Sequence, residues 1–202
     1  SSPTIVLFGD SHASQWFPAL EPFSTKGGFR LETIVKFGCP PVDAPFVDKV
    51  IGRVFTECEE WRRGAIQKIR QIRPLLTVLT YREHYPIRED AWHSGIDSIV
   101  QDLAESSENV LILRDTPQAE IDIPSCLARF AWRSSFIPAP SCEFTFPGTS
   151  NVYEFQRSAA AQHNNVHTAD LSPSICPNGH CSGIRGDLIV YRDTDHLTAS
   201  FA

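Results

Sequence analysis

Short apolar runs recur along the chain, and each has the length of one β-strand. The run at 4–8 shows no alternation of polar and apolar residues, which is typical of a strand that is buried on both faces of a parallel sheet. Further stretches that contain apolar or β-branched residues predict four more strands, at 30–36, 74–81, 109–113 and 165–170. We therefore expect a central sheet of five strands.

Segments with a helical period separate these runs. The apolar residues of 91–104 fall on one helix face. Helices are also predicted at 13–20, where Pro18 limits the pattern, at 57–72 and at 150–162. Strands that alternate with helices favour a parallel sheet with right-handed crossovers. The expected fold class is α/β, a three-layer α/β/α sandwich around a mostly parallel five-stranded sheet.

Two segments break this alternation. Segment 116–149 is rich in proline and holds two cysteines, which predicts an irregular insertion with a short helix at 126–132. About 30 residues are too few for an independent core, so we expect a single domain over 1–202. Segment 174–191 is expected to form a disulfide-pinned hairpin, because its Pro-Asn-Gly and Arg-Gly-Asp triplets suit turns. Segment 42–56 is expected to be a loop.

Composition narrows the class of protein. The 202 residues are 42% hydrophobic and 21% charged, as in a globular domain with a sizeable core. A formal charge of −6 disfavours a nucleic-acid surface, and no apolar run approaches the ~18 residues that span a bilayer. The sequence contains no Met, so we expect that Ser1 is not a translation start. We expect the chain to be a piece of a longer protein.

The six cysteines are an even number, which suits disulfides in an oxidising compartment. Neighbours along the chain bracket stretches that contain Pro or Gly, which predicts the pairs Cys39–Cys58, Cys126–Cys142 and Cys176–Cys181. The alternative is a zinc site formed by Cys176, Cys181, His163, His167 and His180. The spacing is not CxxC, and adjacent His180 and Cys181 are poorly arranged to bind one ion.

Reactive side chains gather at both ends of the chain. Gly9-Asp10-Ser11-His12 follows the first predicted strand, so Ser11 is expected between the carboxyl end of a strand and the start of a helix, where α/β sheets bind ligands. Free N–H groups and the helix dipole favour negative charge there. Asp10 is expected to accept hydrogen bonds in the turn. At the other end, Asp193 and His196 have the spacing Asp-x-x-His.

These motifs resemble known ones. Gly9-Asp10-Ser11-His12 resembles block I of the SGNH hydrolase superfamily, and Asp193-x-x-His196 has the spacing of its last block. With Gly-Cys-Pro-Pro at 38–41 and Tyr-Arg at 191–192, the chain resembles the extracytoplasmic SGNH domain that is fused to membrane acyltransferases of acyltransferase family three. That resemblance implies an O-acetyltransferase for a bacterial cell-surface polysaccharide, with a membrane acyltransferase domain in the same full-length chain.

The resemblance also implies roles for particular residues. Ser11 would be the nucleophile, His196 its general base, and Asp193 the residue that orients the imidazole. The oxyanion would bind the N–H of Ser11 and that of Gly38, where the lack of a side chain lets the chain approach closely. After the third predicted strand the family's Gly-Asn pair is missing, and Arg82 stands where the family often has Arg. Its role stays open between oxyanion donor, glycan ligand and solvated charge.

Asp195 also lies near His196, but side chains three residues apart can face the same side, which favours Asp193 as the partner.

Other functions use the same residues. A carbohydrate acetylesterase would share the triad, and a glycan-binding module would not need it. A metallophosphoesterase would take Asp10, His12, Asp193, Asp195 and His196 as ligands, but its further Gly-Asp, Asn-His and His-x-His elements are missing. We expect an extracytoplasmic enzyme that uses a glycan acceptor and an acyl donor, without a cofactor, a metal or nucleic acid.

Overall fold

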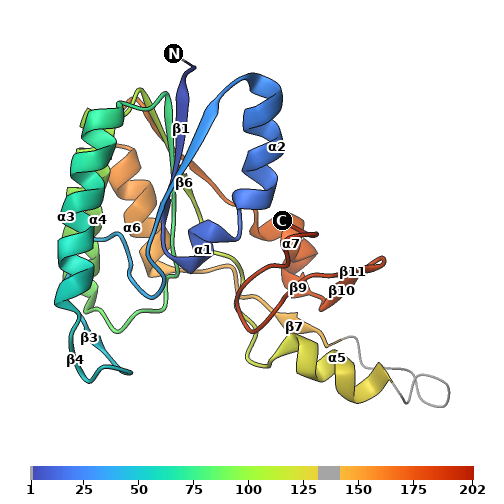
Figure 1. Ribbon diagram of the computed structural model, residues 1–202. Coiled ribbons are helices and arrows are strands. Elements are labelled where there is room, and N and C mark those ends of the chain that lie inside the picture. The colour runs from blue at the N-terminus through green and yellow to red at the C-terminus, as the bar shows by residue number, and fades with distance from the viewer. Residues whose placement is uncertain (1, 132–141) are drawn as a thin grey trace. The chain divides into compact units, whose positions relative to one another are not determined.

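The computed structural model describes residues 2–131 and 142–202 (Figure 1). The chain forms two compact units, each built from two segments. The first unit comprises Ser1–Asp115 and Ser150–Ala169, and the second comprises Thr116–Thr149 and Asp170–Ala202. Among the described residues, no helix has both the length and the apolar character needed to cross a membrane.

The first unit contains a five-stranded sheet with the strand order β2-β1-β5-β6-β8. Its strands are β1 (Thr4–Gly9), β2 (Arg30–Val35), β5 (Leu76–Thr80), β6 (Asn109–Leu113) and β8 (Val166–Ala169). All neighbouring strands pair in parallel, which confirms the predicted sheet. Every residue of β1 is buried, as the unbroken apolar run at its position indicates.

Helices cover this sheet as the alternation predicts. On one face lie α3 (Thr56–Ile72), α4 (Glu89–Ser106) and α6 (Asn151–Ala160), and α2 (Phe17–Gly27) lies on the other (Figure 1). The core beneath the three helices joins the β1 side chains of Val6 and Phe8 to Ile69 of α3 and Ile96 of α4. Ser150 caps α6, because its hydroxyl accepts a hydrogen bond from the N–H of Tyr153.

The predicted helix at 13–20 is wrong in its extent. Two helices stand there instead, α1 (Ser11–Ser14) and α2, and Pro18 occupies the first turn of α2. Proline is well placed in a first turn, because its missing N–H has no helical partner at that position. Pro18 therefore marks the start of a helix, where the sequence pattern had suggested a limit.

The predicted loop at 42–56 contains a short hairpin of β3 (Val47–Asp48) and β4 (Arg53–Val54). The carboxylate of Asp48 accepts hydrogen bonds from the N–H groups of Val50 and Ile51, at 2.8 and 3.0 Å. The side chain of Asp48 therefore fixes this turn by binding the main chain. Such a bond produces no periodic pattern of apolar residues, so the sequence pattern does not predict the hairpin.

The described residues of the second unit form only short helices and strands. Its elements are α5 (Ile123–Ala131), β7 (Phe144–Thr145), α7 (Ser172–Ile175), the 3-10 helix η1 (Pro177–Gly179), β9 (His180–Cys181), β10 (Ile184–Arg185) and β11 (Leu188–Ile189). The predicted helix at 126–132 begins earlier, and residue 132 lies outside the described residues. The predicted hairpin is β10 with β11, whereas β9 pairs with β7.

The three predicted disulfides are confirmed: Cys39–Cys58, Cys126–Cys142 and Cys176–Cys181. The first joins the loop after β2 to α3, and the other two lie within the second unit. Because Cys176 and Cys181 are bonded to each other, neither offers a thiolate to a metal. The alternative zinc site is therefore wrong.

We expect the longest closed loop to contribute most to stability. Replacing both Cys39 and Cys58 by alanine opens a loop with a separation of 19 residues and should lower the free energy of unfolding by ~3 kcal/mol, as chain entropy predicts. The control is the matching change of Cys176 and Cys181, with a separation of 5, which should cost ~2 kcal/mol. Urea unfolding without reductant measures both, and a larger loss in the control would contradict the expectation.

Candidate functional site

The carboxyl ends of four neighbouring strands meet at one edge of the first unit's sheet. Gly38 follows β2, Ser11 follows β1, Arg82 follows β5 and Asp115 follows β6. The chain leaves β1 to form β2 on one side and β5 on the other. Such a switch in strand order is where open α/β sheets bind ligands, so Ser11 lies where the sequence predicts it.

Gly9 allows the turn that carries Ser11. Its φ is +154°, and a Cβ at this position would lie 1.8 Å from the carbonyl oxygen of Thr80. Only glycine fits this close approach of β1 to β5. The next residue, Asp10, caps α1 by accepting a hydrogen bond from the N–H of His12 at 2.8 Å. Ser11 is therefore the first residue of a helix that is only four residues long.

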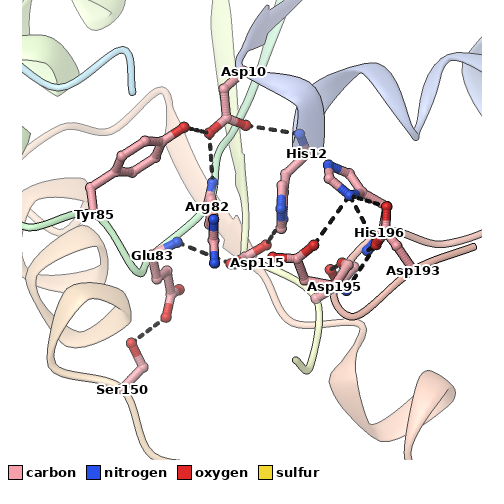
Figure 2. Close-up of polar contacts among 11 residues, drawn as sticks. Asp10, His12, Arg82, Glu83, Tyr85, Asp115, Ser150, Asp193, Asp195 and His196 are labelled. Atoms are coloured by element: carbon pink, nitrogen blue, oxygen red, sulfur yellow. Dashed lines mark hydrogen bonds and ion pairs between the residues drawn. The ribbon is translucent and has the colours of Figure 1, made fainter. Parts of the chain in front are cut away.

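Asp10 also binds the loop that follows β5. One carboxylate oxygen accepts the bond from His12, and the other accepts from the N–H of Arg82 at 3.1 Å and the hydroxyl of Tyr85 at 2.7 Å (Figure 2). Burial raises the pKa of Asp10, and these donors oppose that rise. The predicted role of Asp10 as a turn acceptor is confirmed.

A buried pair of His12 and Asp115 lies beside this turn. The Nδ1 of His12 is 2.5 Å from Oδ1 of Asp115, and both side chains are almost fully buried. The other oxygen of Asp115 accepts a hydrogen bond from the N–H of Glu83 at 3.0 Å. The carboxyl group of Glu83 in turn accepts a bond from the hydroxyl of Ser150, the cap of α6 (Figure 2).

Glu83 is a carboxyl group of this network whose pKa lies near neutral pH. Burial, and then the nearby charge of Asp115, raise its pKa from 4.5 to about 7, although the bond from Ser150 opposes the rise. A carboxyl group that titrates near neutral pH at the edge of a ligand-binding sheet is typical of functional sites, although structural networks produce it too.

Gly38 and Arg82 differ in whether the main-chain N–H is already hydrogen-bonded. Among the described residues, neither the N–H of Ser11 nor that of Gly38 donates a hydrogen bond. Gly38 has a φ of +70°, which favours glycine, and a Cβ there would meet no described protein atom within 4 Å. The N–H of Arg82 is bound to Asp10, so Arg82 could donate only through its side chain.

The second unit holds the other candidate residues. The Nδ1 of His196 is 2.9 Å from Oδ2 of Asp193 and 3.2 Å from Oδ1 of Asp195 (Figure 2). Asp193 also accepts hydrogen bonds from the N–H groups of Asp195 and His196, at 3.0 and 2.7 Å. These bonds form a side-chain turn that holds Asp193 against the imidazole.

The start of the insertion supports this loop. The N–H of Ala119 donates to the carbonyl oxygen of Thr194 at 2.7 Å, and the hydroxyl of Thr116 donates to that of Asp195 at 2.8 Å. The sequence gives no signal for either bond, because they join residues more than 70 positions apart. The loop of Asp193 and His196 therefore depends on a segment whose sequence predicts only irregular structure.

The structure thus brings the predicted site residues together in two groups. Ser11, Gly38 and Arg82 share one sheet edge in the first unit, and Asp193 contacts His196 in the second. The triad as a whole stays a prediction. Sequence reasoning missed the roles of five residues, namely His12, Glu83, Tyr85, Asp115 and Ser150. Only His12 belongs to a recognisable motif.

Comparisons with known proteins agree with this fold. A family model described as "SGNH domain (fused to AT3 domains)" matches residues 1–202. The solved periplasmic domain of a lipopolysaccharide acetyltransferase from Salmonella ser. Paratyphi A superposes with a TM-score of 0.75 and 17% identity, over all of this chain and 79% of that one. Among curated proteins, none matches. Together the family and the fold support an acyl hydrolase or acyl transferase role.

We expect Glu83 to make stability depend on pH. Between about pH 4.5 and 7 the unfolded chain loses the Glu83 proton while the folded chain keeps it, so the free energy of unfolding falls as pH rises, by roughly 3 kcal/mol at most. Glu83→Gln should remove this part of the slope. Urea unfolding from pH 4 to 8 measures the difference, with Glu108→Gln at an exposed position as the control. A difference between Glu83→Gln and the wild type that stays constant with pH would contradict the expectation.

Proposed function

We propose, since the chain belongs to the family of SGNH domains that are fused to AT3 domains, that it is a serine-dependent O-acyltransferase that forms an acyl-enzyme on Ser11. The contact of His196 with Asp193 carries the proposal. An Asp that binds Nδ1 leaves Nε2 as the basic nitrogen and stabilises the imidazolium that forms during proton transfer. The edge position of Ser11 and the N–H groups of Ser11 and Gly38 support it.

The reaction needs two acyl transfers. In the first, Oγ of Ser11 attacks the acyl carbonyl carbon while Nε2 of His196 takes the hydroxyl proton, and the bond to the donor's leaving group then breaks as His196 returns the proton to it. In the second, an acceptor hydroxyl gives its proton to His196 and attacks the acyl-enzyme, which releases Ser11. The two N–H groups would stabilise the oxyanion in both steps.

The acceptor that we propose is a bacterial cell-surface polysaccharide, and the acyl group is acetyl. The similar solved domain belongs to a lipopolysaccharide acetyltransferase, which supports this class of acceptor. Three disulfides favour an oxidising compartment outside the cytoplasm. The AT3 domain to which family members are fused would hold the full-length protein at the membrane and supply the acyl group.

The first test asks whether Ser11 is a nucleophile. Native protein treated with a fluorophosphonate probe should carry one adduct, on the peptide that contains Ser11, as found by mass spectrometry. Ser14 lies in the same helix, so Ser14→Ala is the matched control and should keep the adduct, whereas Ser11→Ala should lose it. Labelling that is unchanged in Ser11→Ala would refute the proposed nucleophile.

The second test asks which aspartate serves His196. Asp193→Asn should lose ~10²–10⁴-fold in turnover of a small acetyl ester, by analogy with the serine-protease triad, because the imidazole would adopt the wrong tautomer. Asp195→Asn, which removes the more distant carboxylate, should stay within about tenfold of the wild type. The opposite order would reassign the partner of His196. The same assay with added glycans separates a transferase from an acetylesterase. A transferase would transfer the acetyl group to a suitable glycan, whereas no glycan would change the rate at which an acetylesterase hydrolyses the ester.

A further inference from the structure

We infer that Asp10 and Asp115 act together as positioning residues that hold the turn of Ser11 and the loop of Arg82 in one fixed arrangement. The inference rests on the proposed function of Ser11, and it assigns to the two carboxylates a role beyond the triad. We call this arrangement the aspartate clamp, defined by Asp10, His12, Arg82, Glu83 and Asp115.

Each aspartate binds residue 12 with one oxygen and the loop after β5 with the other. Asp10 accepts from the main chain of His12 and from the N–H of Arg82. Asp115 contacts the imidazole of His12 and accepts from the N–H of Glu83. One bridge therefore runs from the main chain of His12 to Arg82, and the other runs from the side chain of His12 to Glu83 (Figure 2).

The strand order explains why two aspartates are used. In the sheet, β5 lies between β1 and β6, and successive N–H groups of an extended chain point to opposite sides. The N–H of Arg82 thus meets Asp10, which follows β1, and the N–H of Glu83 meets Asp115, which follows β6. The clamp continues the sheet's hydrogen bonds beyond the ends of its strands, with carboxylates in place of carbonyl groups.

Burial makes the clamp stiff. Asp10 and His12 are 0% and 1% exposed, and Asp115 is 6% exposed, so water does not compete well for these bonds. Hydrogen bonds to a carboxylate are stronger than neutral ones. Breaking one bridge would leave a buried charge with fewer partners, which is costly.

The rigid clamp positions Ser11. This serine stands between Asp10, which accepts a hydrogen bond from the loop that presents Arg82, and His12, which is linked to that loop through Asp115. A shift of about 1 Å in a reacting group can cost about 10²-fold in rate. The clamp therefore fixes the distance from the serine to Arg82, and a substrate held by Arg82 would meet Oγ in one geometry.

The test is a double-mutant cycle with Asp10→Asn and Asp115→Asn. An amide oxygen accepts less strongly than a carboxylate and its NH₂ group cannot accept, so each change breaks one bridge while keeping the side-chain shape. Each single variant should label with the fluorophosphonate probe about 10–10²-fold more slowly than the wild type. The double variant should be within about threefold of the slower single variant, because a clamp fails once either side opens.

Asp48→Asn is the matched control, because Asp48 also accepts two main-chain N–H bonds but lies in the hairpin of β3 and β4. It should label within about twofold of the wild type. Circular dichroism checks that each variant is folded. If Asp115→Asn does not fold, His12→Asn breaks the same bridge from its other end and takes its place in the cycle. Rate losses that multiply in the double variant, or an equal loss in Asp48→Asn, would overturn the clamp.

Amide hydrogen exchange keeps this result separate from the proposed function. In each variant the N–H whose acceptor is weakened, Arg82 or Glu83, should exchange at least tenfold faster, and in the double variant both should. Labelling of Ser11 in the wild type tests whether Ser11 is a nucleophile. If the wild type is not labelled, the proposed function is refuted, but amide exchange at Arg82 and Glu83 still tests the clamp. Exchange at Arg82 and Glu83 that stays unchanged in the variants would overturn the clamp even where Ser11 is labelled.

Discussion

The main chains of β1 and β5 approach each other so closely at Gly9 that any side chain there would collide with the carbonyl group of Thr80. This approach brings the turn of Asp10, Ser11 and His12 to within hydrogen-bond distance of the loop that begins at Arg82. The candidate nucleophile, its neighbours and the loop after β5 are therefore positioned by one backbone contact. Gly9 matters because it has no Cβ and because its φ suits glycine.

Three carboxyl groups gather around that contact, at Asp10, Glu83 and Asp115, and each is costly to bury. Every one of them accepts at least one hydrogen bond, from N–H or hydroxyl donors contributed by α1, the β5 loop or the cap of α6. The remaining cost is visible in Glu83, whose pKa rises to about 7. Buried carboxyl groups at this end of the sheet lower the stability of the fold, but their hydrogen bonds fix the local geometry. This exchange of stability for geometry is expected at a functional site.

The second unit is stabilised in a different way from the first. Its residues come from the insertion and from the C-terminal segment, and its strands are only two residues long. Two disulfides stabilise it where secondary structure is sparse. The result is a small support for one loop, in which Thr116 and Ala119 hold the main chain beside Asp193 and His196.

The sequence by itself determined the parallel sheet, the disulfide pairs and the family, because apolar runs, cysteine order and short motifs are local signals. It also located Ser11 at the edge of the sheet, since Gly9 and the strand before it mark that turn. Only the tertiary structure decided that Pro18 starts a helix, that Gly38 has a φ that favours glycine, and that Asp115 and Glu83 bind the turn of Ser11. The reason is that a buried hydrogen bond between His12 and Asp115 spans 103 residues, and no local pattern records a partner at that distance.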